Sequence, residues 1–470
     1  MIRWSFFLLV CAAVTLEAAA GPIRKAGSGQ PIQTGKCNDV PAHPFDLILG
    51  RPTSSSVTVS VLCYENAQGY IAYGKQPGQL TSSTPTRMFG KDDPAEILLS
   101  SLQPDTQYFY RLHLDQGDSD EFSCRTARTP GSTFTFTVTA DSHLDENTDC
   151  ALYQRTLANA LADAPDFHID LGDTFMTEKY AGRTEAARQY LAQRFYFGQL
   201  CESAPLFLVL GNHDGESWHE RSGDTNSLAV WSNLMRKQYF PNPIPDDLYT
   251  GDLTNQPGAG LLQDYYAWSW GDALFIVLDP FWFTPKPQGG SNWNWTLGQE
   301  QYQWLRRTLE DSRARLRFVF IHNLVGGADA QGRGGAEAAV FYEWGGHNAD
   351  GSDGFAQNRP GWPSPIHQLL VQNKVSIVFH GHDHFFAKQD LDGVVYQEVP
   401  QPGMPGGGKV PRSAAEYGYV SGVMFGSPGY MRITVSPDKV TADLVYSCLP
   451  ADEVTGRNNQ QVLHTYTIPD

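Results

Sequence analysis

Short apolar runs in the second part of the chain predict buried strands that alternate with helices. Three of these runs are Phe134–Ala140, Asp166–Leu171 and Leu206–Leu210, which are rich in aromatic and aliphatic residues. Stretches with a helical pattern lie between them, over residues 151–161 and 186–191. A β-α-β-α-β order indicates a parallel sheet, because parallel neighbours need a crossover connection.

Later segments extend this α/β pattern. The runs Tyr265–Trp270 and Ala273–Leu278 flank a Gly-Asp turn and predict a hairpin. A helix is expected over Gln299–Ser312, before a strand that begins near Phe318. We therefore expect residues 131–470 to form one α/β domain.

Residues 37–130 show a different pattern, with short alternating runs and frequent turns. The runs Ser56–Leu62 and Gly69–Gly74 alternate between inward and outward positions, as half-buried strands do. Residues Leu102–Leu112 resemble the tyrosine corner and following strand of a fibronectin type III-like sandwich. We therefore expect a small all-β domain ahead of the α/β domain.

The first 36 residues are expected to lie outside both domains. Arg3, the apolar core Phe6–Leu16 and the small residues Ala18–Ala20 are typical of a secretory signal peptide over residues 1–20. Residues 21–36 are rich in Gly, Pro, Ser and Gln and predict a linker. The protein is therefore predicted to be secreted or periplasmic, and no later stretch is apolar enough for a transmembrane helix.

Composition narrows the possible partners. The chain has 470 residues and a formal net charge of −17, which argues against nucleic acid as the main partner. Cysteines in an exported chain are consistent with disulfides. Those beyond the predicted cleavage site are Cys37, Cys63, Cys124, Cys150, Cys201 and Cys448. Their connectivity stays open, although Cys37 and Cys124 bracket the all-β domain and are predicted to pair.

Polar clusters follow the ends of five apolar runs. The last is Phe379-His380-Gly381-His382-Asp383-His384, after Val375–Val378. Its paired histidines suit two neighbouring metal ions, because imidazole is a common ligand for transition metals. Ligands bind at strand ends along one edge of an α/β sheet, so we expect the five clusters to meet. The other four are Asp141-Ser142-His143, Asp170-Leu171-Gly172-Asp173, Gly211-Asn212-His213-Asp214 and His322-Asn323.

The order Asp-x-His, Gly-Asp, Gly-Asn-His-Asp, His and Gly-His-x-His resembles the calcineurin-like metallophosphoesterase superfamily. All five blocks occur in sequence between Phe134 and Asp390. The resemblance implies a two-sheet α/β sandwich flanked by helices. A fibronectin type III-like domain precedes the catalytic domain in purple acid phosphatases and their relatives, and the predicted all-β domain is similar to it.

The resemblance also implies a ligand set for two metal ions. Asp173 is expected to bridge both ions. The other ligands are Asp141, His143 and His384 on one ion, and Asn212, His322 and His382 on the second. A mixed nitrogen and oxygen set suits divalent or trivalent Mn, Fe or Zn better than Ca or Mg.

Residues beside these ligands are candidates for substrate chemistry. The resemblance implies that His213 contacts the phosphate or protonates the leaving oxygen, with Asp214 orienting its ring. Arg333 could contact a phosphate, because guanidinium suits that anion, although a solvated loop arginine is the alternative. Three further polar residues are expected to be buried or to point away from the ions: Asp170, His380 and Asp383.

One position departs from the purple acid phosphatase pattern. Those enzymes carry a tyrosine ligand three residues after the bridging aspartate, and this chain has Met176 there. Methionine cannot act as a phenolate ligand, so the purple colour of that family is not expected from this position.

Together these residues predict an exported dinuclear enzyme that hydrolyses small phosphomonoesters with a metal-activated hydroxide. One alternative is a phosphodiesterase acting on small diesters or nucleotides, and another is a metal-dependent hydrolase of a different electrophile. A non-catalytic metal-binding relative of the fold is the third, but none of the seven ligands is missing. The oligomeric state and the roles of two predicted long loops, residues 215–255 and 325–365, stay open.

Overall fold

The structure is a computed structural model that describes residues 37–145, 147–180, 182–217, 225–285 and 291–469. The predicted signal peptide and linker lie outside these residues. The described residues group as one compact unit. Within the described ranges, no helix is both long and apolar enough to cross a membrane.

The first strands pair into two antiparallel sheets. They are β1 (Phe45–Gly50), β2 (Val57–Cys63), β3 (Ala67–Gly74), β4 (Ser82–Ser83), β5 (Arg87–Phe89), β6 (Ala95–Leu99), β7 (Gln107–Leu114), β8 (Gly117–Asp118) and β9 (Phe122–Arg125). One sheet has the order β1-β2-β6, and the other β4-β3-β7-β8, with β5 on β3 and β9 on β7. The Tyr108 hydroxyl accepts the backbone N–H of Gln103 at 2.9 Å, as in a tyrosine corner. The predicted all-β domain is therefore confirmed.

Two larger sheets follow. The first has the order β12-β11-β10-β21-β22-β23 and the second β13-β14-β15-β16-β17-β19-β18-β20. The strands of the first are β10 (Phe134–Thr139), β11 (Phe167–Asp170), β12 (Leu206–Leu208), β21 (Gly429–Val435), β22 (Lys439–Tyr446) and β23 (Val462–Pro469). Those of the second are β13 (Thr250–Gly251), β14 (Tyr266–Trp270), β15 (Ala273–Val277), β16 (Leu316–Phe320), β17 (Ile377–His380), β18 (Phe385–Leu391), β19 (Val394–Glu398) and β20 (Val423–Gly426). Strands β10, β11 and β12 are parallel, as are β15, β16 and β17.

Aromatic side chains fill the space between the two larger sheets. Phe136 of β10 lies with its ring centroid 5.3 Å from that of Phe275 in β15 and 6.2 Å from that of Phe379 in β17. All three side chains are fully buried. Edge-to-face rings at these distances add to the free energy of burial. The two-sheet sandwich expected from the sequence is confirmed.

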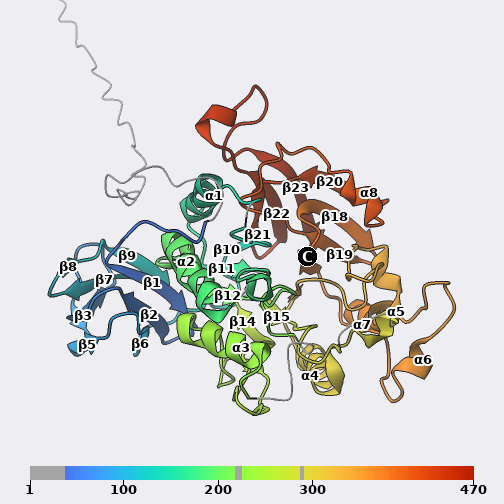
Figure 1. Cartoon of the computed structure of the whole chain (residues 1–470), viewed down its shortest axis with the longest axis horizontal. Coiled ribbons are helices and arrows are strands. Elements are labelled where there is room, and N and C mark those ends of the chain that lie inside the picture. Colours follow the sequence, from blue (N-terminus) through green and yellow to red (C-terminus); the bar gives the residue numbers. More distant parts are fainter. Residues whose placement is uncertain (1–36, 146, 181, 218–224, 286–290, 470) are drawn as a thin grey trace, which may run out of the picture. The chain divides into compact units, whose positions relative to one another are not determined.

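Helices cover the outer faces of this sandwich (Figure 1). The helices of the described residues are α1 (Cys150–Ala162), α2 (Arg183–Cys201), α3 (Leu228–Tyr239), α4 (Gly298–Asp311), α5 (Tyr342–Gly345), α6 (Phe355–Asn358), α7 (Ile366–Gln372) and α8 (Ser413–Glu416), of which α6 has no buried residue and lies away from the sheets (Figure 1). Apolar residues of α1 and α2 pack with β12, and those of α4 and α7 pack with β15, β16 and β17. The Asp149 carboxylate caps α1 by accepting the backbone N–H groups of Ala151 and Leu152.

The two segments predicted as long loops contain helices. Helix α3 lies within residues 215–255, and α5 and α6 lie within residues 325–365. The Ser227 hydroxyl caps α3 by accepting the backbone N–H of Val230. The predicted long loops are therefore interrupted by helices, which the many Gly, Asp and Asn residues of these segments did not indicate.

The N-terminal sandwich is fixed to α2 by a buried arginine. Arg194 is fully buried and donates to the Ser60 hydroxyl at 3.0 Å and to the Ser60 carbonyl at 3.1 Å. The Tyr110 hydroxyl donates to the carbonyl of Glu202 at 2.6 Å. The division of the chain at residues 130 and 131 stays a prediction, since both parts belong to one compact unit.

The predicted Cys37–Cys124 pair is wrong. Cys37 is bonded to Cys150, the first residue of α1. Cys124 faces the core of the N-terminal sandwich, whereas Cys37 packs with residues of α1 and α2 and cannot enter that core. The remaining described cysteines are buried thiols: Cys63, Cys124, Cys201 and Cys448.

Candidate metal centre

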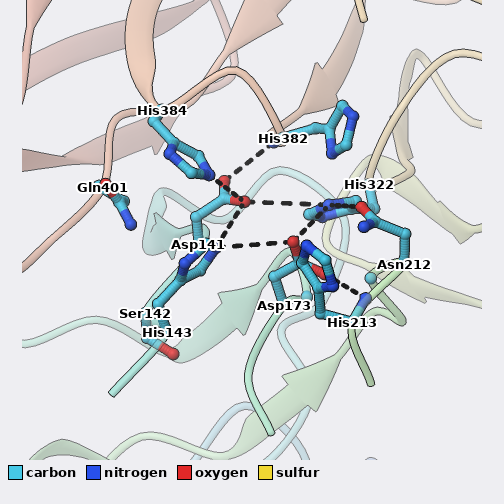
Figure 2. Close-up of polar contacts among 12 residues, drawn as sticks. Asp141, Ser142, His143, Asp173, Asn212, His213, His322, His382, His384 and Gln401 are labelled. Atoms are coloured by element: carbon cyan, nitrogen blue, oxygen red, sulfur yellow. Dashed lines mark hydrogen bonds and ion pairs between the residues drawn. The ribbon is translucent and has the colours of Figure 1, made fainter. Parts of the chain in front are cut away.

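The five polar clusters meet where β10, β11, β12, β16 and β17 end. These strands come from both larger sheets, so the site lies across the sandwich at one edge. Figure 2 shows the predicted ligand side chains converging, with Asp141 at the centre of contacts to His143, His322 and His384. The sheets therefore bring together groups that are far apart in the sequence.

One group consists of Asp141, His143 and His384. The Oδ1 atom of Asp141 lies 3.6 Å from Nε2 of His143 and 3.5 Å from Nε2 of His384. One ligand atom from each residue lies within 4.8 Å of the others, so the three could hold a metal ion.

The second group consists of Asp173, His322 and His382, which meet the same criterion. The Oδ2 atom of Asp173 lies 3.3 Å from Nε2 of His322 and 3.5 Å from Nε2 of His143 in the first group. Asp173 therefore faces both groups, where a bridging ligand would lie. The Oδ1 atom of Asn212 lies 3.1 Å from Nε2 of His322.

Hydrogen bonds behind the rings select the nitrogen that faces the site. His322 donates its Nδ1–H to the carbonyl of Leu171 at 2.8 Å, which leaves Nε2 as an acceptor. His382 donates Nε2–H to the carbonyl of Gln331 at 2.9 Å, which leaves Nδ1. Such bonds hold the rings of metal-binding histidines in place.

The backbone at the site is strained. Non-glycine residues rarely adopt positive φ, and such residues concentrate at functional sites. Five predicted ligands do so: Asp141 (φ 57°), His143 (49°), Asp173 (55°), His382 (80°) and His384 (67°). Gly211 is required for space, because a Cβ atom there would lie 2.3 Å from Oδ1 of Asp173.

Neighbouring charges determine the protonation of the buried ligands. Burial raises the pKa of Asp141, but the neighbouring His384, His143 and His322 together bring it below its usual value. Burial alone would lower the pKa of His322, but Asp173 raises it to about 9. Burial lowers the pKa of His382 to about 3, so this ring is neutral and able to ligate.

The site has buried acceptors that lack a partner. Neither Oδ1 of Asp141 nor Nε2 of His143 has a hydrogen-bond partner among the described residues. Unpaired buried polar atoms are costly and commonly mark an ion. A transition-metal cation between carboxylate and imidazole atoms would satisfy both, so the donor set fits such a metal.

His213 and Asp214 do not pair as expected. Nδ1 of His213 contacts the carboxylate of Glu178, and its backbone N–H donates to Oδ1 of Asp173 at 2.8 Å. Asp214 instead accepts four backbone N–H groups, from Asp173, Thr174, Phe175 and Gly211. The prediction that Asp214 orients the ring is therefore wrong, because its carboxylate faces the backbone of the neighbouring loop.

The other predicted residues lie around the ligands. Asp383 points away from them and accepts the backbone N–H of Gly334 at 2.9 Å. His380 is buried, with Nδ1 lying 2.6 Å from Oε2 of Glu398. Asp170 is buried and accepts the hydroxyls of Thr139 and Thr174. Their predicted supporting positions are confirmed.

Arg333, the candidate phosphate contact, and Met176, which replaces a tyrosine ligand, have different surroundings. The guanidinium of Arg333 lies 4.3 Å from the ring centroid of Tyr417, and its side chain is 27% exposed. Met176 is buried, and the nearby Tyr180 hydroxyl accepts the amide of Gln189.

Sequence reasoning missed Glu178, Glu398 and the acceptor Asp145, whose Oδ2 lies 3.3 Å from Nδ1 of His143. Glu178 contacts His213, Glu398 contacts His380 and Asp145 contacts His143. Glu178 and Asp145 lie within a few residues of Asp173 and His143 in the sequence, whereas Glu398, at the end of β19, gave no such signal.

Known proteins resemble this chain in its family pattern and in its fold. The family description "calcineurin-like phosphoesterase" matches residues 134–386, more than half of the chain. No curated protein shows significant similarity to this sequence. The solved structure of PhoD is 15% identical, with a TM-score of 0.61 over 94% of this chain and 90% of that one. Purple acid phosphatase PPD1 from yellow lupin (Lupinus luteus) seeds is also 15% identical, with a TM-score of 0.59 over 90% of this chain and 74% of its own.

Proposed function

The chain belongs to the calcineurin-like phosphoesterase family, a family of phosphoester hydrolases, and on this premise we propose that it cleaves small phosphomonoesters at the candidate metal centre. The observation that carries the proposal is the contact of Asp173 with both groups of candidate ligands. A carboxylate in this position would hold two cations close together, as two-metal hydrolysis requires.

We infer that the site takes two ions of Mn, Fe or Zn. Asp141, His143 and His384 would hold one, Asn212, His322 and His382 the other, and Asp173 both. The ions would supply neutralisation of the phosphate charge and activation of a water molecule.

His213 is the proposed proton donor to the leaving oxygen. Its backbone is fixed by Asp173, and its ring centroid lies 6.2 Å from that of His143. The ring is 29% exposed, so a substrate can reach it. A positioned histidine typically contributes about 10²–10⁴-fold to such a step.

Arg333 is the proposed second contact to the phosphate. Its loop is held beside the site because Gly334 donates to Asp383, which lies between two predicted ligands. A monoester dianion gains more than a diester anion from one further cation. The proposed contact with Arg333 would therefore favour monoesters over diesters.

The protein is proposed to act outside the cytoplasm. The predicted signal peptide supports export, and the Cys37–Cys150 disulfide is of the kind that persists in oxidising compartments. The substrate is then a small phosphoester available outside the cytoplasm.

The test is turnover by protein reconstituted with Mn, Fe or Zn and compared with metal-stripped protein. We expect 4-nitrophenyl phosphate to be cleaved faster than bis(4-nitrophenyl) phosphate. Faster turnover of the diester would favour the phosphodiesterase alternative. Metal-replete protein that cleaves neither ester would overturn the proposed function.

A further inference from the structure

A glutamine side chain lies beside the first metal group. Gln401 is 2% exposed, and its Oε1 atom is buried and has no hydrogen-bond partner among the described residues. Figure 2 shows this side chain on the side of the site where His384 and His143 lie, with its amide nitrogen turned towards them and without a hydrogen bond to the other residues drawn. Buried polar atoms without a partner are rare in folded proteins and commonly mark a place where a ligand supplies one.

The topology of the second large sheet places Gln401 at the metal centre. Strand β19 is parallel to its neighbour β17, with Glu398 paired to His380 at their carboxyl ends. The loop after β17 carries His382 and His384, and the loop after β19 carries Gln401. Both loops therefore leave the sheet at the edge where ligands bind in such folds.

Backbone hydrogen bonds hold Gln401 in place without its side chain. Its N–H donates to the Ser427 hydroxyl at 3.0 Å, and its carbonyl accepts the N–H of Gly429 at 3.3 Å. The Ser427 hydroxyl in turn donates to the carbonyl of His384 at 2.8 Å. The backbone of Gln401 is thus tied to that of a candidate ligand, and its amide group is left for a bound molecule.

An uncharged donor suits a position beside a metal ion. The glutamine amide has two N–H donors and no charge, so it can approach a bound phosphate without repelling the cations, as a lysine or an arginine would. A phosphomonoester has three terminal oxygens, whereas a diester has two, because its second ester group replaces one of them. An amide at this position therefore has more acceptors available in a monoester than in a diester.

We propose that Gln401 is a substrate-binding residue whose amide donates to a terminal phosphoryl oxygen on the side of His143 and His384; this rests on the proposed phosphoester hydrolysis. The contact is made by the bound ester and by released phosphate alike, so it affects KM more than kcat. It is weakened in a diester, and Gln401 thereby selects monoesters. The residue exchanges no proton with the substrate.

Two variants remove or reverse this contact. Gln401→Met keeps the length of the side chain but has no donor, whereas Gln401→Glu keeps the shape and places a negative charge beside the phosphate. The backbone bonds to Ser427 and Gly429 are open to both variants, so the loop should stay in place. Gln299→Glu is the matched control, because Gln299 is exposed in the first turn of α4 and undergoes the same charge change.

The first measurement does not depend on turnover. Each protein is loaded with zinc, its metal content is measured, and the binding of inorganic phosphate is followed by isothermal titration calorimetry. We expect the affinity for phosphate to fall about 10-fold in Gln401→Met, the scale of one hydrogen bond to a charged group, and further in Gln401→Glu. Gln299→Glu should match the wild type. Loss of an ion from Gln401→Met would make the amide a metal ligand and overturn the proposal.

The second measurement tests the selection of monoesters. The KM of Gln401→Met should rise about 10-fold for 4-nitrophenyl phosphate, with a smaller change in kcat, and should rise less for bis(4-nitrophenyl) phosphate. An equal rise for both esters would overturn the selection.

The two measurements separate this contact from the proposed function. Wild-type phosphate affinity and wild-type KM in both Gln401 variants would overturn the contact even where the monoester is cleaved. If phosphate binding weakens as expected but the wild type cleaves neither ester, the proposed function fails and the contact stands. A wild type that binds no phosphate overturns the contact as well.

Discussion

The carboxylate of Asp214 accepts the backbone N–H of Asp173, with 3.1 Å between the nitrogen and Oδ2. The same oxygen accepts the N–H of Gly211 at 2.7 Å. Its other oxygen accepts the N–H groups of Thr174 and Phe175, at 2.8 and 2.7 Å. One side chain thereby ties the loop of the bridging aspartate to the loop of Asn212 and His213.

Asp214→Ala should therefore destabilise the fold. The change leaves four buried N–H donors without a partner, and each buried unpaired group costs about 1–3 kcal/mol. We expect the free energy of unfolding, measured with urea on metal-free protein, to fall by at least about 3 kcal/mol. Asp214→Asn keeps one acceptor oxygen and should lose less. Wild-type stability in Asp214→Ala would contradict this bracing role.

The bridging position of Asp173 predicts a specific metal stoichiometry. Elemental analysis should find about two transition-metal ions per chain. Asp173→Ala removes a ligand from both groups and should deplete both ions, whereas His384→Ala touches only one group and should mainly deplete one. Wild-type metal content in Asp173→Ala would argue against a bridge.

His213→Ala should separate metal binding from catalysis. His213 belongs to neither metal group, so metal content should stay near the wild-type value. The kcat on alkyl phosphates should fall about 10²–10⁴-fold, with a smaller loss on nitrophenyl esters. A defect of the same size on both ester types would instead assign His213 to holding the phosphate.

The spacing of the motifs along the chain allowed most of the candidate ligands to be predicted, but not the residues that hold the site in place. A strand followed closely by Asp141, Asp173 or His322 fixes which end of the sheet each side chain reaches, so the clusters could be expected to meet. The partner of His213 could not be predicted, because Glu178 reaches it only through the packing of one loop on another. The Cys37–Cys150 pair was missed for the same reason.

A pair of buried carboxyl groups predicts a pH dependence of stability. Asp264 and Asp279 are both buried and their carboxyl groups repel each other when charged; burial raises the pKa of Asp279 to about 6 and that of Asp264 well above its usual value. The folded state then holds more protons than the unfolded state above about pH 4, where free aspartate ionises. The contribution of this pair to the free energy of unfolding therefore falls as pH rises from about 4 through 6, by up to about 1.4 kcal/mol per pH unit for each proton.

Asp264→Asn should flatten this slope. The variant removes one titrating group and the repulsion between the two carboxylates. Urea unfolding of metal-free wild type and variant at a series of pH values between about 4 and 8 compares the two slopes directly. Parallel curves for the two proteins would show that the pair does not titrate in this range.

The cysteine pattern predicts four thiols and one disulfide in the described chain. Alkylation of denatured mature protein, read by mass spectrometry, should label Cys63, Cys124, Cys201 and Cys448 before reduction and also Cys37 and Cys150 after it. Replacing Cys37 by serine should cost about 2–5 kcal/mol of stability, because the bond closes a sequence separation of 113 residues. A disulfide that includes Cys124 would contradict the structure.

Strand β10, which leads into Asp141, lies between β11 and β21 in its sheet (Figure 1). β11 comes soon after β10 in the chain, but β21 follows every predicted ligand, including His384. During synthesis the ligands are therefore all made before the sheet that supports Asp141 is complete. The sheet around Asp141 is therefore completed by a strand that is made after every ligand, and an exported chain would load its ions from the compartment in which it folds rather than from the cytoplasm in which it is made.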